Sequence, residues 1–340
     1  PWAGSTLPPW ILPTGAGIEY GLFVLDDLSL LNLMADLPEV PRALDRGTAW
    51  LVIEDALLDN RVAVERVRLL ALEMLEIERN ELLIGHLLGL IDNLFWRWSS
   101  DEARTAWAPE LEQVLLRGLE RAESVSERAL WFNAWRRTVT TSDGVERMRR
   151  IWARDDSVPG LPLSERDETR LAHELALRSV ADAEAVLDIQ RERIANPDRR
   201  AQFDFVRPAY AADESAREAF FASLAEVGNR AREPWVLQGL GALHHPLRRA
   251  HSERFVAPSL ELLHEIQRTG DIFFPARWLG TTLENHRSAA VVEQVVRYLG
   301  GTRDLPPRLR AKVLQSADPV VRALRIVEGR SLQLPGPAAR

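Results

Sequence analysis

Residues 81–96 read ELLIGHLLGLIDNLFW, and this stretch decides the fold class. Its leucines recur at intervals of four, three and four residues, which places them in one stripe along a helix. They are Leu83, Leu87, Leu90 and Leu94. Similar stripes run through residues 64–75, 111–122 and 288–299. The period of about 3.6 residues holds from Asp26 onward and predicts a mainly α protein, with more than about 60% helix against a usual third.

Signals for the starts and ends of helices divide this pattern into about fifteen helices, most of them about 10–20 residues long. Asp27 is placed to cap a helix that runs to about Leu37, and Pro38 then ends it. Pro41 opens the next helix, near residues 41–58. Further boundaries are expected at Asp143-Gly144, Pro159-Gly160, Asn196-Pro197, Gly228, Pro246, Gly300-Gly301 and Asp318-Pro319.

Two of these boundaries carry a specific expectation. Ser164 and Asp167 have the spacing of a capping box, in which each side chain bonds the other's backbone N–H. Pro319 suits the first position of a helix, where a missing N–H costs nothing.

The connections between the expected helices are short, mostly about two to eight residues, so neighbouring helices should be antiparallel. A continuous series of such pairs over residues 27–332 exceeds one globular bundle. It predicts an irregular α-solenoid of antiparallel helix pairs, of HEAT-like type, arranged in a curved layer. Residues 333–340 contain Pro335, Gly336 and Pro337 and are expected to form a loose tail.

Residues 1–26 differ from the rest. Aromatic and β-branched residues flank Gly15-Ala16-Gly17, which predicts a short β-hairpin, with strand confined to about residues 8–25. In the second strand both faces are apolar, and an isolated hairpin is marginal in water. We therefore expect these strands to be the remnant of a β-sandwich.

Composition excludes several classes of function. The chain has 340 residues and a net charge of −7, so it has no general attraction to nucleic acid. It has no cysteine, which excludes disulfides, thiolate zinc sites and cysteine nucleophiles. No apolar run is long enough to span a bilayer. The start, at Pro1, shows neither Met nor a signal peptide, which favours a piece of a longer chain and leaves cytoplasm and periplasm both open.

Zinc peptidase chemistry needs the pattern His-Glu-x-x-His. His173-Glu174 and His264-Glu265 each supply only the first half, and we expect both to lie on ordinary helix surface. His244, His245 and His251 form the densest histidine cluster, but their spacing crosses Pro246 and does not favour a metal site. The chain also lacks a Gly-x-Ser-x-Gly elbow and a P-loop. No catalytic, cofactor-binding or metal-binding residue is therefore assigned.

The tryptophans on helices and the arginine-rich segment 190–200 can each be interpreted as a binding surface or as ordinary structure. Trp131 and Trp135 share a helix face and could form a peptide groove, but burial in the core is the preferred interpretation. Trp96 and Trp98 are read in the same way. Residues 190–200 hold four arginines and two acids, which is typical of a solvated face rather than a nucleic-acid footprint.

One family resemblance is carried by segments near the start of the chain and by one later segment. The segments are Trp10-Ile11-Leu12-Pro13, Glu19-Tyr20-Gly21-Leu22-Phe23-Val24-Leu25-Asp26, and Arg46-Gly47-x-x-Trp50 with Asp55-Ala56, and Glu78-Arg79-Asn80-Glu81-Leu82 and Arg277-Trp278-Leu279-Gly280 lie at compatible places. Together they resemble zinc aminopeptidases of the aminopeptidase N family. The resemblance covers most of the chain and is clearest over residues 9–100. The spacing from Arg46 to Asp55 is similar to that of a bacterial branch.

The resemblance implies that the chain is the C-terminal part of such an enzyme, namely the end of the small β-sandwich and the helical domain. The parent would remove N-terminal residues from peptides with one Zn²⁺. The family's Gly-Ala-Met-Glu-Asn motif and zinc helix are absent from this sequence, so the helical domain would be non-catalytic. Its partners would be the N-terminal catalytic domain of the same polypeptide and the peptide in the chamber that the two domains enclose.

Two alternatives stay open. The chain could be a freestanding HEAT-like scaffold that binds a protein partner, or an independent all-α enzyme with an unrecognised site. The hairpin argues against the scaffold, which needs no pair of strands with two apolar faces at its start.

Overall fold

Helices make up most of the computed structural model, which describes residues 8–13, 17, 21–302 and 305–335. This part of the chain is 74% helix and has no strand, which confirms a mainly α fold. The α-helices are α1 (Asp27–Asp36), α2 (Ala43–Leu58), α3 (Val64–Ile77), α4 (Glu81–Trp96), α5 (Asp101–Arg121), α6 (Val125–Thr138), α7 (Ser142–Ala153), α8 (Glu165–Leu177), α9 (Ala183–Arg193), α10 (Pro197–Tyr210), α11 (Glu214–Ser223), α12 (Glu233–Leu243), α13 (Arg249–Ser252), α14 (Val256–Glu261), α15 (Leu263–Thr269), α16 (Phe274–Leu283), α17 (Ala289–Gly301) and α18 (Pro307–Glu328). Four 3₁₀ turns are η1 (Leu37–Glu39), η2 (Val227–Arg230), η3 (Pro246–Arg248) and η4 (Glu253–Phe255).

The helices group into two compact units. Unit 1 consists of Pro1–Ser99 and Glu110–Trp135, and unit 2 consists of Ser100–Pro109 and Arg136–Arg340. Each has a hydrophobic core of its own, so each is described separately.

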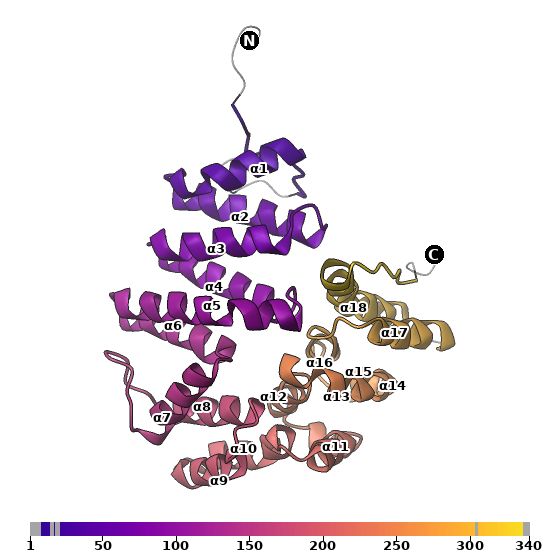
Figure 1. The fold of residues 1–340 in the computed structure, drawn as a ribbon. Helices are drawn as coiled ribbons and strands as arrows, with labels where there is room; N and C mark the ends of the chain where they lie inside the picture. The colour runs from indigo at the N-terminus through magenta and orange to yellow at the C-terminus, as the bar shows by residue number, and fades with distance from the viewer. Residues whose placement is uncertain (1–7, 14–16, 18–20, 303–304, 336–340) are drawn as a thin grey trace. The chain divides into compact units, whose positions relative to one another are not determined.

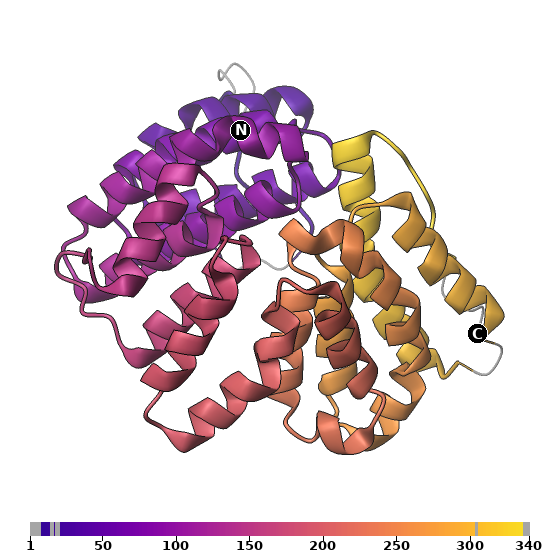
Figure 2. The same cartoon turned by 60° about the horizontal axis from the view of Figure 1, so that its bottom comes forward.

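In unit 1, each helix packs on the next: α1 on α2, α2 on α3, and α3 on α4. Figure 1 shows α1 to α4 side by side in chain order, and the turned view of Figure 2 shows the same helices (indigo to purple) side by side as well. The core contains fully buried Trp50 and Trp131, with Trp135 only 1% exposed. Gly118 permits this packing, because a Cβ there would lie 2.3 Å from the Trp131 ring.

In unit 2, α7 packs on α8, α8 on α9, and α10 on both α11 and α12. Further along, α12 contacts α16, and α18 contacts α16 and α17. Phe203, Trp278 and Phe274 are among the largest fully buried side chains of this core. Their burial explains why short helices such as α14 and α15 persist, since most helical stability in proteins comes from packing.

Several expected helix boundaries are confirmed. Ser164 and Asp167 form both hydrogen bonds of a capping box at the start of α8. Asn196 caps α10, and Pro197 is its first residue. At α1 the cap is one residue earlier than expected, because the side chain of Asp26 rather than Asp27 accepts the N–H of Ser29.

The boundary expected at Pro319 is wrong. This residue lies inside α18, which continues to Glu328. Proline removes one helical hydrogen bond at this point. Ala317, Val320 and Leu324 are buried on either side of it, and their packing keeps the helix continuous.

The N-terminal hairpin is not confirmed. Among the described residues of that region, 8–13, 17 and 21–25, none is in a strand. The remaining positions of the expected hairpin, 14–16 and 18–20, lie outside the described residues, as do 336–340 of the expected tail. The described segment contacts α1 of the same unit, since Trp10 Nε1 donates to Asp36 at 2.7 Å.

A search of the described helices for a membrane span found none that is both long and apolar enough.

Candidate functional site

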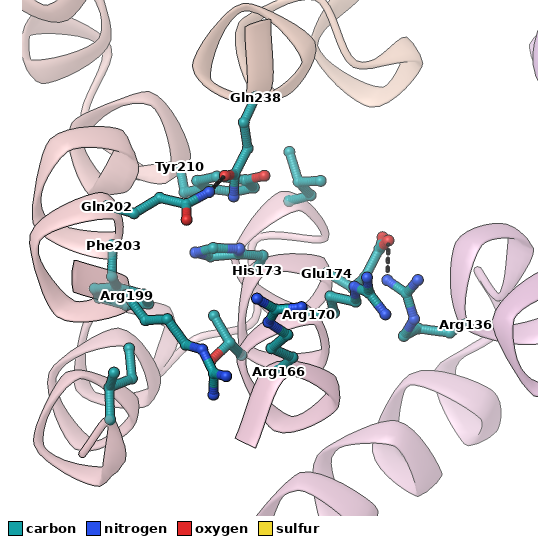
Figure 3. Close-up of a pocket in the computed structure, with 13 residues that line it drawn as sticks. Arg136, Arg166, Arg170, His173, Glu174, Arg199, Gln202, Phe203, Tyr210 and Gln238 are labelled. Atoms are coloured by element: carbon teal, nitrogen blue, oxygen red, sulfur yellow. Dashed lines mark hydrogen bonds and ion pairs between the residues drawn. The ribbon is translucent and has the colours of Figure 1, made fainter. Parts of the chain in front are cut away.

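A cavity of about 530 Å³ opens in unit 2 between α8, α10 and α12, beside the end of α6 (Figure 3). This volume is within the range of small-ligand pockets. We call it the arginine pocket. It is lined by Arg136, Arg166, Thr169, Arg170, His173, Glu174, Leu177, Ile194, Arg199, Gln202, Phe203, Tyr210 and Gln238.

His173 forms part of the pocket wall. Its ring stacks on Tyr210 with a centroid distance of 3.9 Å and on Phe203 at 5.2 Å, and only 5% of the residue is exposed. Burial, together with the nearby charge of Arg136, lowers the pKa of His173 to about 3. The imidazole is therefore neutral at physiological pH. Its Nε2 is buried and has no hydrogen-bond partner among the described residues.

Next to this ring lies a wall of neutral polar groups. Gln202 Nε2 donates to Gln238 Oε1 at 2.7 Å, which joins α10 to α12. Burial raises the pKa of Tyr210 to about 12, so the phenol stays protonated despite its hydrogen bond with Gln238. Figure 3 shows the His173 ring pointing toward Tyr210 and Gln202.

Four arginines from three elements supply the charge of the pocket. Arg136 comes from the end of α6, Arg166 and Arg170 come from α8, and Arg199 comes from α10. Figure 3 shows Arg136 and Arg199 on opposite sides of the view, with Arg166 and Arg170 between them. Their cationic groups are therefore distributed around the cavity.

Three of these arginines also have acidic partners. Arg136 Nη1 lies 2.9 Å from Glu174 Oε1, Arg170 Nη1 lies 3.3 Å from Asp167, and Arg199 Nη1 lies 3.0 Å from Glu165. Glu174 is shared, because Arg178 Nη1 lies 2.6 Å from its Oε2. With these partners included, five arginines face three carboxylates, which leaves a surplus of two positive charges.

Such a set of donors recognises oxyanions. Guanidinium groups bind carboxylate and phosphate in bidentate geometry, and neutral amides add directional hydrogen bonds. The same set does not fit zinc, which takes imidazole, thiolate and carboxylate ligands. Across the described residues, no three His, Asp or Glu side chains come together as a metal site would require.

The sequence interpretation of His173 and Glu174 as surface residues is wrong. Both are at least nine-tenths buried, because α8 packs on α9 and α10 and Glu174 is held by two arginines. His264 is exposed on α15, as expected, and Glu265 pairs with Arg230 at 3.0 Å.

The cluster of His244, His245 and His251 does not assemble. His244 instead pairs with His286, with Nδ1 to Nε2 at 2.9 Å, while His251 lies 3.2 Å from Glu214. A partner 42 residues away cannot be found from local spacing.

The core reading of the tryptophans is confirmed, since Trp96, Trp98, Trp131 and Trp135 are all at most 7% exposed. The arginine-rich segment 190–200 is only partly a solvated face. Arg191 pairs with Asp204 at the surface, as expected. Arg199, however, lines the pocket, which no feature of the local sequence indicated.

The residues that carried the family resemblance lie mostly in unit 1 and have structural contacts. Arg46 Nε and Nη2 donate to the two oxygens of Glu78 at 2.8 and 2.7 Å. Trp50 is fully buried, and in unit 2 the buried Trp278 donates to the carbonyl of Ser259 at 3.2 Å. These contacts hold helices together.

Comparison with protein-family models gives no match for this sequence, and a search of curated proteins gives none either.

Proposed function

We propose that this chain is the non-catalytic helical part of a bacterial zinc aminopeptidase, which packs on the N-terminal catalytic domain of the same polypeptide and encloses the peptide chamber. The observation that supports this best is the arginine pocket, a small-ligand cavity with a surplus of positive charge. We propose that this pocket binds part of the peptide, while the catalytic domain cleaves it.

The pattern of helix contacts agrees with the proposal. Successive helices pack on one another in unit 1, as in a series of stacked antiparallel pairs. We propose that the helices form an irregular HEAT-like solenoid, because this architecture presents extended inner faces to a partner. The sequence resemblance at Arg46, Trp50 and Glu78 gives the proposal its enzyme family.

The experiment is to express the 340-residue chain alone and together with the polypeptide encoded directly upstream. We expect the upstream segment to contain His-Glu-x-x-His, to copurify with the chain, and to hydrolyse aminoacyl-anilides in a chelator-sensitive reaction. The chain by itself should release no amine from these substrates, with or without added zinc. Hydrolysis by the purified chain alone, or an upstream sequence without the zinc motif, would contradict the proposal.

The scaffold alternative is favoured by one observation. No strand is present at the described residues 8–13, 17 and 21–25, so the argument against a freestanding scaffold is weaker than the sequence suggested. In addition, Leu44 and Leu51 of α2 are each about half exposed. The same coexpression separates the two readings, because a scaffold would leave the upstream product's activity and solubility unchanged.

A further inference from the structure

We propose that the arginine pocket is a binding site for a ligand that carries two carboxylates, and that in the intact protein this ligand is an acidic stretch of peptide. The choice of a peptide rests on the function proposed above. The carboxylate chemistry rests on the pocket alone.

The first step of the argument is charge. The pocket arginines, their acidic partners and Arg178, which shares Glu174 with Arg136, together have a surplus of two positive charges. Arg166 is exposed and has no acidic partner among the described residues. Arg199 pairs with Glu165, and both side chains of this pair are partly exposed to solvent. A ligand with two negative charges would neutralise the surplus.

The second step is the distribution of the arginines. They come from the end of α6, from α8 and from α10, and Figure 3 shows them spread in a row from Arg199 to Arg136 instead of converging on one point. A single small tetrahedral ion reaches only some of them. A longer ligand, with carboxylates separated by several bonds, reaches guanidinium groups on more than one side.

The third step is the unpartnered polar atom. His173 is 95% buried by its neighbours, and its Nε2 has no hydrogen-bond partner in the described part of the chain. A buried polar atom without a partner is unfavourable. The ring stacks on both Tyr210 and Phe203. Because Nε2 is fully covered, a ligand group forms a hydrogen bond with it once the side chains over it shift.

The fourth step is the neutral wall. Gln202 and Gln238 bond to each other, which leaves amide hydrogen-bonding capacity for a second polar ligand group. Peptide groups are both donors and acceptors, and a glutamine pair suits them. An acidic peptide therefore matches the arginines with its side chains and the amide wall with its backbone.

The test measures binding to the purified chain by calorimetry at low and at moderate salt. The probes are an N-acetylated, C-amidated tetraglutamate, its tetraglutamine counterpart, glutarate and inorganic phosphate. Blocking both ends ensures that only side-chain carboxylates are tested. We expect the tetraglutamate to bind, the tetraglutamine not to bind, and affinity to fall as salt rises.

Three variants assign the binding to the pocket. Arg166→Gln combined with Arg199→Gln should weaken tetraglutamate binding at least about tenfold, since a charge-assisted hydrogen bond contributes enough for that change. His173→Phe retains the ring stack and removes Nε2, and it should also weaken binding. Arg191→Gln is the control, because this arginine is about as exposed as Arg199 but pairs with Asp204 outside the pocket. It should bind as the unmodified chain does.

Each outcome decides something. Equal binding by the double variant and the control overturns the site, as does tighter binding of phosphate than of either carboxylate ligand. If glutarate binds and tetraglutamate does not, the pocket is a dicarboxylate site, and the proposal that its ligand is an acidic peptide is contradicted. The coexpression experiment is independent of all these results, so failure of the pocket and failure of the proposed enzyme role are distinguishable.

Discussion

Each unit contains an ion pair between an arginine and a largely buried glutamate, and the two pairs differ in their surroundings. In unit 1, Glu78 accepts both Arg46 contacts and the backbone N–H groups of Arg79 and Asn80, each at 2.9 Å. Arg46 also donates to the carbonyls of Val40 and Pro41. The Arg46 guanidinium and the Glu78 carboxylate therefore both have several hydrogen-bond partners.

In unit 2, both oxygens of Glu174 are also held by arginines, but Glu174 lines a cavity together with His173, whose Nε2 has no partner among the described residues. A satisfied cluster fixes the positions of helices, whereas an incomplete one next to open space has capacity for a ligand. The difference between the two clusters therefore separates a structural role from a binding role.

The largest expected effect comes from breaking the unit 1 cluster. Glu78→Ala leaves Arg46 buried without its carboxylate and leaves two backbone N–H groups unpaired. Removing one partner of a buried pair costs about 3–5 kcal/mol, so the free energy of unfolding should fall by that amount. Urea unfolding measures it. Glu73→Ala on the exposed face of α3 is the control and should change stability by less than about 0.5 kcal/mol. Similar losses for both variants would show that the Glu78 contacts are not structural.

The next effect tests how tightly the cores are packed. Gly118→Ala places a methyl group 2.3 Å from the fully buried ring of Trp131, and overpacking of this kind costs about 1–3 kcal/mol. Gly89 is also helical, in α4, but has no atom within 4 Å of a Cβ. Gly89→Ala should therefore raise stability by up to about 1 kcal/mol. Thermal unfolding of the two variants should give shifts of opposite sign; shifts of the same sign would contradict the close approach of α5 and α6.

Much of the fold follows from patterns of neighbouring residues. The leucine stripe of α4, the capping box at Ser164 and the cap at Asn196 are all local signals, and each is confirmed. Pro319 misled because the packing of α18 outweighs the lost hydrogen bond. The pocket could not be predicted in the same way. Arg136, His173 and Arg199 are 26 or more residues apart, and only the packing of three helices brings them to one cavity.

A further effect concerns pH, and it has opposite signs in the two units. In unit 2, burial lowers the pKa of His173 and of His286 to about 3. The folded chain then binds fewer protons than the unfolded chain between about pH 6.5 and pH 3. The free energy of unfolding should fall as pH drops through this window, by about 1.4 kcal/mol per pH unit for each histidine.

In unit 1, the hydrogen bond to Glu54, whose Oε1 is 2.6 Å away, raises the pKa of His86. This histidine stabilises the fold at low pH, and its contribution is lost as pH rises through the folded pKa. Urea unfolding of His173→Phe should show a flatter decline toward pH 5 than the unmodified chain. His86→Gln should show a steeper one. Parallel pH profiles for all three proteins would contradict the assigned directions.

The smallest expected effect is on stability at the rim of the arginine pocket. Arg166 is exposed and unpaired among the described residues, and Arg199 makes one partly exposed ion pair with Glu165. Surface pairs contribute about 0–1 kcal/mol, and removing a guanidinium from a set of four relieves repulsion. Arg166→Gln combined with Arg199→Gln should therefore leave the free energy of unfolding, measured with urea, within about 0.5 kcal/mol of that of the unmodified chain. Arg46→Gln, by contrast, should lower it by several times as much, because that arginine completes the satisfied cluster in unit 1.

A rim variant as unstable as Arg46→Gln would mean that the pocket arginines hold helices together, and the contrast between the two clusters would disappear. A stable rim variant that has lost tetraglutamate binding would instead separate the two roles within one protein, with unit 1 using its buried charge for structure and unit 2 for recognition.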